Sequence, residues 1–188
     1  MNSPAPEGAH TASEFVRLGW CLVAPWTSPA GRPVWSVSPH LNGVEPGPAE
    51  WASWYVDLEV AREACRNSSV PETSVVEVAV LEDDAARLLA REPQADWWDL
   101  RLLREGIPGS SGSRVLGHEP VGGQDCLLEH SWYCFEHPAQ LVVPPHHVEV
   151  NEAGLVGDWA TAERVVDHCQ QDRSLHSEIW VGLRVSLV

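Results

Sequence analysis

The clearest hydrophobic pattern in the chain lies at its C-terminal end. Residues 179–187 alternate between apolar side chains and other residues, and this period of two predicts a β-strand. Before it, residues 158–169 carry apolar side chains at helical spacing. Asp158 stands where its carboxylate accepts a hydrogen bond from the first turn of such a helix. The chain is therefore predicted to end in a helix that packs on a strand.

The same patterns predict helices and strands along the rest of the chain. Strands are expected over residues 15–26, 34–38, 75–81, 114–121, 126–143 and 147–150. Helices are expected in the second half of residues 50–66 and over residues 82–92 and 97–105. The mixture predicts an α+β fold.

Composition divides the chain into five parts. Residues 1–13 are rich in proline, alanine and serine and are expected to be a disordered tail, and residues 106–113 form a Gly-Ser-rich linker. Two sequential ββαβ-like lobes are expected over residues 14–81 and 114–188, with a helical insert over residues 82–105. The predicted architecture is one compact body made of these lobes.

The two predicted lobes echo one another in sequence. The matched positions lie 97 to 101 residues apart: Leu18-Gly19 with Leu116-Gly117, Trp35 with Trp132, and Asp57 with Asp158. In each lobe the expected order is a strand, a Trp-bearing strand, a long loop, an Asp-capped helix and a strand. An old internal duplication explains the echo, and chance recurrence of this order in an α+β chain is the alternative.

The charge of the chain restricts the class of partner. The net charge is −15, from 27 acidic residues and 12 basic ones, all of them arginine. The acids are spread along the chain, which argues against binding nucleic acid through its phosphates and favours a basic partner. No apolar run is long enough to span a membrane, and residues 1–13 lack the features of a signal peptide. A cytoplasmic protein without membrane contact is expected.

The soft metal ligands of the chain cluster in one segment. Cys126, His130, Cys134 and His137 form C-x3-H-x3-C-x2-H, and zinc prefers thiolate and imidazole ligands. On a continuous strand these residues spread over more than about 25 Å, and the last faces the opposite way. We therefore expect no metal and no other cofactor. The five cysteines lack a CxxC pair, so free thiols are predicted.

Three classes of function remain, and the weakest is a mimic of nucleic acid, because the acids are scattered instead of concentrated on one helix face. Candidate acid–base residues in a cleft between the lobes are His130, Glu136, His137 and His147. They would make the protein a small enzyme or a ligand-binding protein of a biosynthetic pathway. No nucleophile motif or phosphate-binding loop supports catalysis, because Ser131 lies outside a G-x-S-x-G sequence and Gly109–Arg114 lacks the lysine of a P-loop.

Tryptophan is the compositional outlier, with ten residues. The aromatic and acidic residues expected at the surface are Trp51, Trp54, Tyr55, Asp96, Trp97 and Asp99. Aromatic side chains ringed by carboxylates are typical of a protein–protein hot spot against a basic surface. The favoured interpretation is a non-enzymatic binding protein, such as an inhibitor or immunity-type protein that blocks a basic partner.

Overall fold

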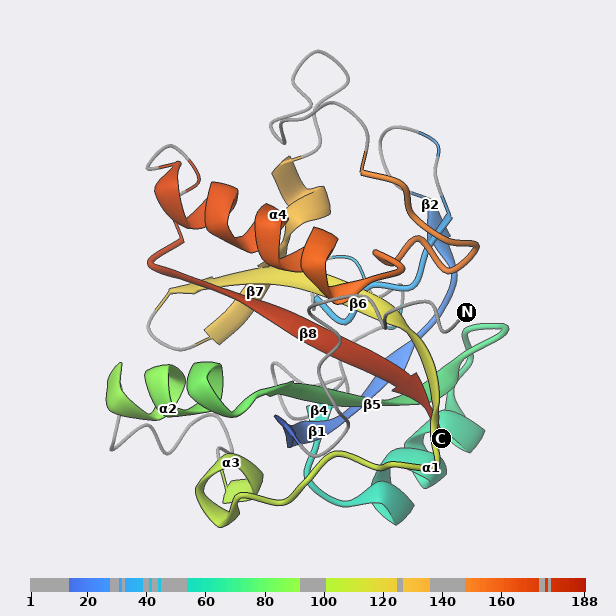
Figure 1. Ribbon diagram of the computed structural model, residues 1–188. Helices are drawn as coiled ribbons and strands as arrows, with labels where there is room; N and C mark the ends of the chain where they lie inside the picture. Colours follow the sequence, from blue (N-terminus) through green and yellow to red (C-terminus); the bar gives the residue numbers. More distant parts are fainter. Residues whose placement is uncertain are drawn as a thin grey trace, which may run out of the picture.

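The computed structural model describes residues 14–27, 31, 33–38, 41, 44, 54–91, 101–124, 127–135, 148–172, 175 and 177–188 (Figure 1). The strands are β1 (Phe15–Val23), β2 (Trp26–Thr27), β3 (Pro33–Val34), β4 (Trp54–Tyr55), β5 (Ser74–Leu81), β6 (Arg114–Gln124), β7 (Leu127–Ser131) and β8 (Ile179–Leu187). The helices are α1 (Leu58–Asn67), α2 (Glu82–Arg91), α3 (Arg101–Glu105), α4 (Trp159–Gln171) and the 3-10 helix η2 (Trp132–Phe135). The predicted α+β class is confirmed.

One antiparallel sheet organises the molecule. Its six strands follow the order β4-β1-β5-β8-β6-β7 and curl into a half-barrel, while β2 and β3 form a separate pair (Figure 1). The C-terminal strand β8 lies in the middle, between β5 and β6. Its residues 179–185 are all buried, so both faces of this strand are covered by other parts of the protein.

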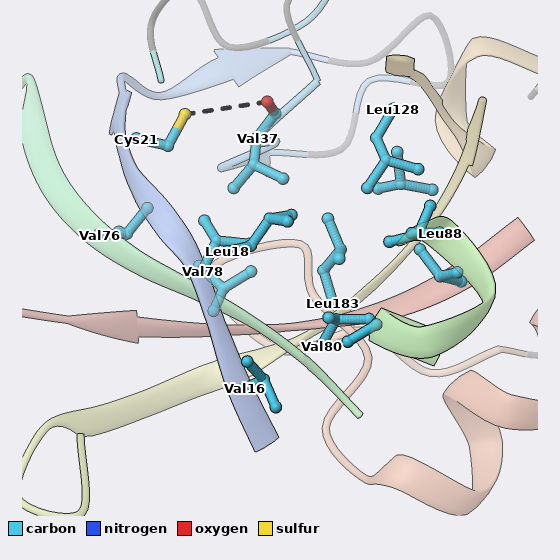
Figure 2. Packing of buried hydrophobic residues seen from close by; sticks show 14 of the residues in the cluster. Val16, Leu18, Cys21, Val37, Val76, Val78, Val80, Leu88, Leu128 and Leu183 are labelled. Carbon is cyan, nitrogen blue, oxygen red and sulfur yellow. Dashed lines mark hydrogen bonds between the residues drawn. The ribbon is translucent and has the colours of Figure 1, made fainter. Parts of the chain in front are cut away.

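One face of the sheet carries the largest apolar cluster. Val76, Val78 and Val80 of β5 alternate along the strand and meet aliphatic residues of β1 and β8 on this face (Figure 2). Leu88 of α2 and Leu103 of α3 pack onto the same cluster. The helical segment that the sequence marked as an insert therefore contributes directly to the core.

Helices α1 and α4 cover the opposite face. Ala61 of α1 packs with Trp20 and Val75, whereas Trp159 of α4 lies so close to Gly182 that a Cβ there would be 2.5 Å from its ring. The register of the central pair places Val75 and Gly182 on the same face. Both helices therefore pack on one side of the half-barrel.

The two predicted aspartate caps are confirmed at the starts of these helices. The Asp57 carboxylate accepts hydrogen bonds from the amides of Glu59 at 2.8 Å and Val60 at 3.1 Å. The Asp158 carboxylate accepts one from the amide of Thr161 at 2.9 Å. Each cap satisfies amides that have no partner inside the helix, so both helices begin where the sequence indicated.

The prediction of two Trp-bearing strands is wrong. Trp35 follows the two-residue strand β3 and is outside any strand, because the next residues bind the buried carboxylate of Glu119 instead of a neighbouring strand. The predicted strand 126–143 ends at Ser131, and Trp132 begins η2. Residues 136–147 lie outside the described part of the chain.

The two halves of the sheet have the same strand arrangement. In each half the last strand lies at the centre of the sheet, the first strand lies next to it and the remaining strand lies at the edge. Val78 of β5 pairs with Val185 of β8, and the strands continue as β5-β1-β4 on one side and β8-β6-β7 on the other. β1 is irregular between Arg17 and Gly19, and β6 is irregular between Val115 and Gly117. The ladder between β5 and β8 joins the two halves into a single continuous sheet.

Candidate functional site

The aromatic residues proposed as a partner surface are described only in part. Trp54 and Tyr55 form the edge strand β4 and are half-buried, while Trp51, Asp96, Trp97 and Asp99 lie outside the described residues. The indole nitrogen of Trp54 donates a hydrogen bond to the carbonyl of Val37 at 3.2 Å, and the ring packs against the main core cluster. Trp54 therefore attaches strand β4 to the core of the protein.

The proposed acid–base residues are likewise described only in part. His130 is half-buried on β7, opposite Gly122 of β6. Glu136, His137 and His147 fall outside the described residues, as does Cys126. Among the side chains that the structure does describe, no three histidine, cysteine, aspartate or glutamate residues are grouped to hold a metal ion. Within the described residues, Cys21, Cys65 and Cys169 form no disulfide.

A buried polar centre occupies the sheet face between α1 and α4. Glu77 of β5 is 1 % exposed and forms an ion pair with Arg17 of β1, with 2.8 Å between its Oε2 and the arginine Nε. Ser110 donates to the same carboxylate from its amide at 2.7 Å and from its hydroxyl at 2.5 Å. These donors stabilise the carboxylate away from water and tie segment 109–113 to the sheet.

Arg184 of β8 completes this polar centre. Its side chain is buried beside Ala79, the residue that it faces across the β5–β8 ladder, and its Cζ lies 4.4 Å from the centroid of the Phe15 ring. Burial lowers the pKa of this guanidinium, and the charge of Glu77 acts in the opposite direction. Phe15 also contacts Trp159, and the ring of His118 lies edge-on to Trp159 with centroids 5.2 Å apart.

Sequence reasoning missed this polar centre, although a signal was present. Glu77 interrupts an otherwise apolar strand, and Arg184 interrupts the final strand in the same way. A charged residue in a buried strand is unusual unless it is paired, so each should have prompted a search for a partner. The neighbours became visible only with the β5–β8 ladder, because the two residues are far apart in sequence.

A second buried carboxylate lies on the other side of the sheet. Glu119 of β6 accepts a hydrogen bond from the hydroxyl of Ser36 at 2.5 Å and one from the amide of Val37 at 2.8 Å. Burial raises the pKa of Glu119, while the bonds from Ser131, Ser36 and Val37 lower it. The carboxylate thus attaches segment 33–38 to the centre of the half-barrel.

An acidic patch, defined here as Asp83, Asp84 and Glu163, lies where the first turn of α2 approaches α4. Asp84 is paired with Arg87, with 2.6 Å between its Oδ1 and the arginine Nη1. Burial raises the pKa of Asp84, Arg87 lowers it, and the negative charges of Asp83 and Glu163 raise it further. The patch therefore combines negative charge from two helices, and its residues Asp84 and Glu163 are 79 residues apart in sequence.

The buried acids serve as internal anchors, because the oxygens of Glu77 and Glu119 already accept hydrogen bonds from the protein. The helices in the described part of the chain are too short or too polar to cross a membrane. No family model, no curated protein and no solved structure matches this chain.

Proposed function

We propose that this protein is a small acidic binding protein that associates with a basic partner protein, in the manner of an inhibitor or immunity-type protein. The observation that carries the proposal is the acidic patch of Asp83, Asp84 and Glu163, in which Arg87 pairs with one carboxylate and the other two are exposed. A concentrated negative field steers a cationic partner to its surface. The net charge of −15 supports the same partner class.

The proposal includes a cytoplasmic location and excludes nucleic acid and membranes as partners. The aromatic component of the interface is assigned to Trp51, Tyr55 and the segment from Asp96 to Asp99. Trp54 is a less suitable probe of binding, because its hydrogen bond to Val37 makes its replacement costly for folding as well.

The test is a pull-down from the native host, followed by association and dissociation kinetics at two salt concentrations. Replacing Asp83 by Asn and Glu163 by Gln should slow association at low salt, and the effect should shrink as salt rises. Trp51→Ala should act mainly on the dissociation rate and cost about 2 kcal/mol of binding free energy if Trp51 is a hot spot.

Glu63→Gln is the matched control, because Glu63 is an exposed acid of α1 and lies away from the acidic patch. Helix α1 precedes strand β5, whereas α2 follows β5 at the other end of the strand. If Glu63→Gln slows association as much as the patch variants do, steering comes from the overall negative charge of the protein, and the acidic patch has no special role. Turnover of a small metabolite that is abolished by replacing His130 or His137 would favour the enzyme alternative.

We also infer that the two halves of the sheet descend from a duplicated unit. The Leu-Gly echo of the sequence coincides with the irregularities of β1 and β6, and Gly19 and Gly117 pair with the central residues Val78 and Val185. The two halves of the sheet should superpose with these residues in equivalent positions. A best superposition that equates other residues would contradict the duplication.

A further inference from the structure

Arg184 is a buried charge that the protein itself leaves incompletely satisfied. The residue is 4 % exposed, and its Nε and Nη2 atoms are buried without a hydrogen-bond partner in the described part of the chain. A guanidinium stays charged under all ordinary conditions, and burying it without a bound anion is unfavourable. We propose that Arg184 is the centre of a binding site for a small oxyanion, a carboxylate or a phosphate, entered beneath segment 109–113.

The neighbouring acid does not neutralise Arg184. The carboxylate of Glu77 is taken up by Arg17 and by the amide and hydroxyl of Ser110, and it forms no ion pair with Arg184. Two guanidinium groups thus share one carboxylate, so the polar centre keeps a positive charge inside a protein whose net charge is −15. A bound monoanion would balance this excess.

The two unpartnered nitrogen atoms indicate the class of ligand. Nε and Nη2 lie on the same edge of the planar guanidinium, and this edge donates two parallel hydrogen bonds to the oxygens of a carboxylate or phosphate. The Phe15 ring, 4.4 Å from Cζ, holds the guanidinium in position. The ligand is therefore a compact oxyanion that fits a bidentate contact.

Gly109 covers the Nη2 end of this edge, and the segment that it begins has to lift before an anion enters. The backbone of Gly109 lies against Arg184 so closely that a Cβ would collide with Nη2. The segment is held by the Gly109 amide, which donates to the Phe15 carbonyl at 2.8 Å, and by the contacts of Ser110 with Glu77. Beyond these anchors, Ser111 and Gly112 are exposed. Replacing Ser110 by Ala removes one anchor and should make entry faster.

The test measures binding of inorganic phosphate and of acetate to the full-length protein, by calorimetry and by thermal unfolding against NaCl of equal ionic strength. Wild-type protein should show saturable stabilisation by at least one of the two anions. The anion that binds more tightly shows whether the site prefers a phosphate or a carboxylate. Arg184→Met should abolish this response, and Arg184→Lys should weaken binding by at least about tenfold because an ammonium lacks the bidentate edge.

Arg164→Met is the control, since Arg164 is an exposed arginine of α4, and it should bind as the wild type does. Stabilisation no greater than in NaCl, or an equal response from the Arg184 variants, would overturn the proposal. If Arg184→Met fails to fold, Arg184→Lys decides the outcome. This site does not depend on the proposed function, because the basic partner is tested with variants of α2 and α4 that leave Arg184 unchanged.

Discussion

At the scale of single residues, a buried ionisable side chain makes the stability of this protein depend on pH. Glu119 is the clearest case, because its carboxylate has hydrogen-bond donors but no cation among the groups that perturb its pKa. Its pKa is raised by burial, so the folded state binds this proton more tightly than the unfolded state. The contribution of Glu119 to stability is therefore greatest below its unfolded value and falls as the pH rises through its folded value.

Glu119→Gln removes this titration. We expect the free energy of unfolding of the variant to rise relative to that of the wild type as the pH increases above the unfolded pKa of a glutamate, about 4.3. Urea unfolding at several pH values measures the difference. Ser111→Ala, an exposed change that removes no ionisable group, is the control and should show no comparable trend. A difference between Glu119→Gln and the wild type that stays constant with pH would contradict the assignment.

Gly182 gives a prediction based on close packing. A Cβ at this position would lie 2.5 Å from Trp159 Cη2 and 2.9 Å from its Cζ3, both parts of a rigid ring held by α4. Gly182→Ala should therefore lower the free energy of unfolding by roughly 1–3 kcal/mol. Gly112→Ala is the matched control, because nothing lies within 4 Å of its added Cβ. Equal unfolding midpoints for the two variants would show that α4 yields easily.

At the scale of elements, α4 depends on its cap. The Thr161 amide stabilises the Asp158 carboxylate and is the main reason that the pKa of Asp158 lies below its usual value. A depressed folded pKa gives stability that is present above the unfolded value and is lost as the pH falls through the folded one.

Asp158→Ala should cost about 1 kcal/mol of unfolding free energy at neutral pH, and the cost should shrink in acid. Asp158→Asn should retain most of the cap, since an amide oxygen also accepts the Thr161 hydrogen bond. Asp167→Ala, at an exposed position later in the helix, controls for loss of charge. A loss for Asp158→Ala that is as large in acid as at neutral pH would rule out the carboxylate as its cause.

At the scale of the whole molecule, the β5–β8 ladder joins residues from the two halves. The largest core cluster includes residues of both, among them Val78 and Leu88 from the first and Val121 and Leu183 from the second. We expect fragments 1–111 and 112–188 to be largely unfolded when separate and to recover the sheet when mixed, because neither half buries this cluster alone.

Circular dichroism and NMR of each fragment and of the mixture test this expectation. Cleavage of the folded chain between Ser111 and Gly112, which are both exposed, is the control and should leave the fold intact. A separate fragment that folds stably by itself would show that the halves are independent domains.

The sequence alone determined the features that depend on local periodicity. The final strand, the strand before α2, helix α2 itself and the two aspartate caps were predictable, because alternation, helical spacing and capping act between residues close in the chain. The two Trp-bearing strands were mispredicted for different reasons. Segment 33–38 is held by hydrogen bonds to Glu119, which is distant in sequence. The other strand ends at Ser131, because the chain turns into the 3-10 helix η2 at Trp132.

The candidate sites were decided by tertiary structure. Glu77 and Arg17 are 60 residues apart, and Asp84 comes under the influence of Glu163 only because α2 lies near α4, with Arg87 Nη2 3.5 Å from Gln170 Oε1. No local pattern fixes the order of strands in a sheet, since pairing depends on which faces bury together and on the register between distant segments. The charged residues of β5 and β8 were therefore visible in the sequence as exceptions, and the fold alone made them neighbours.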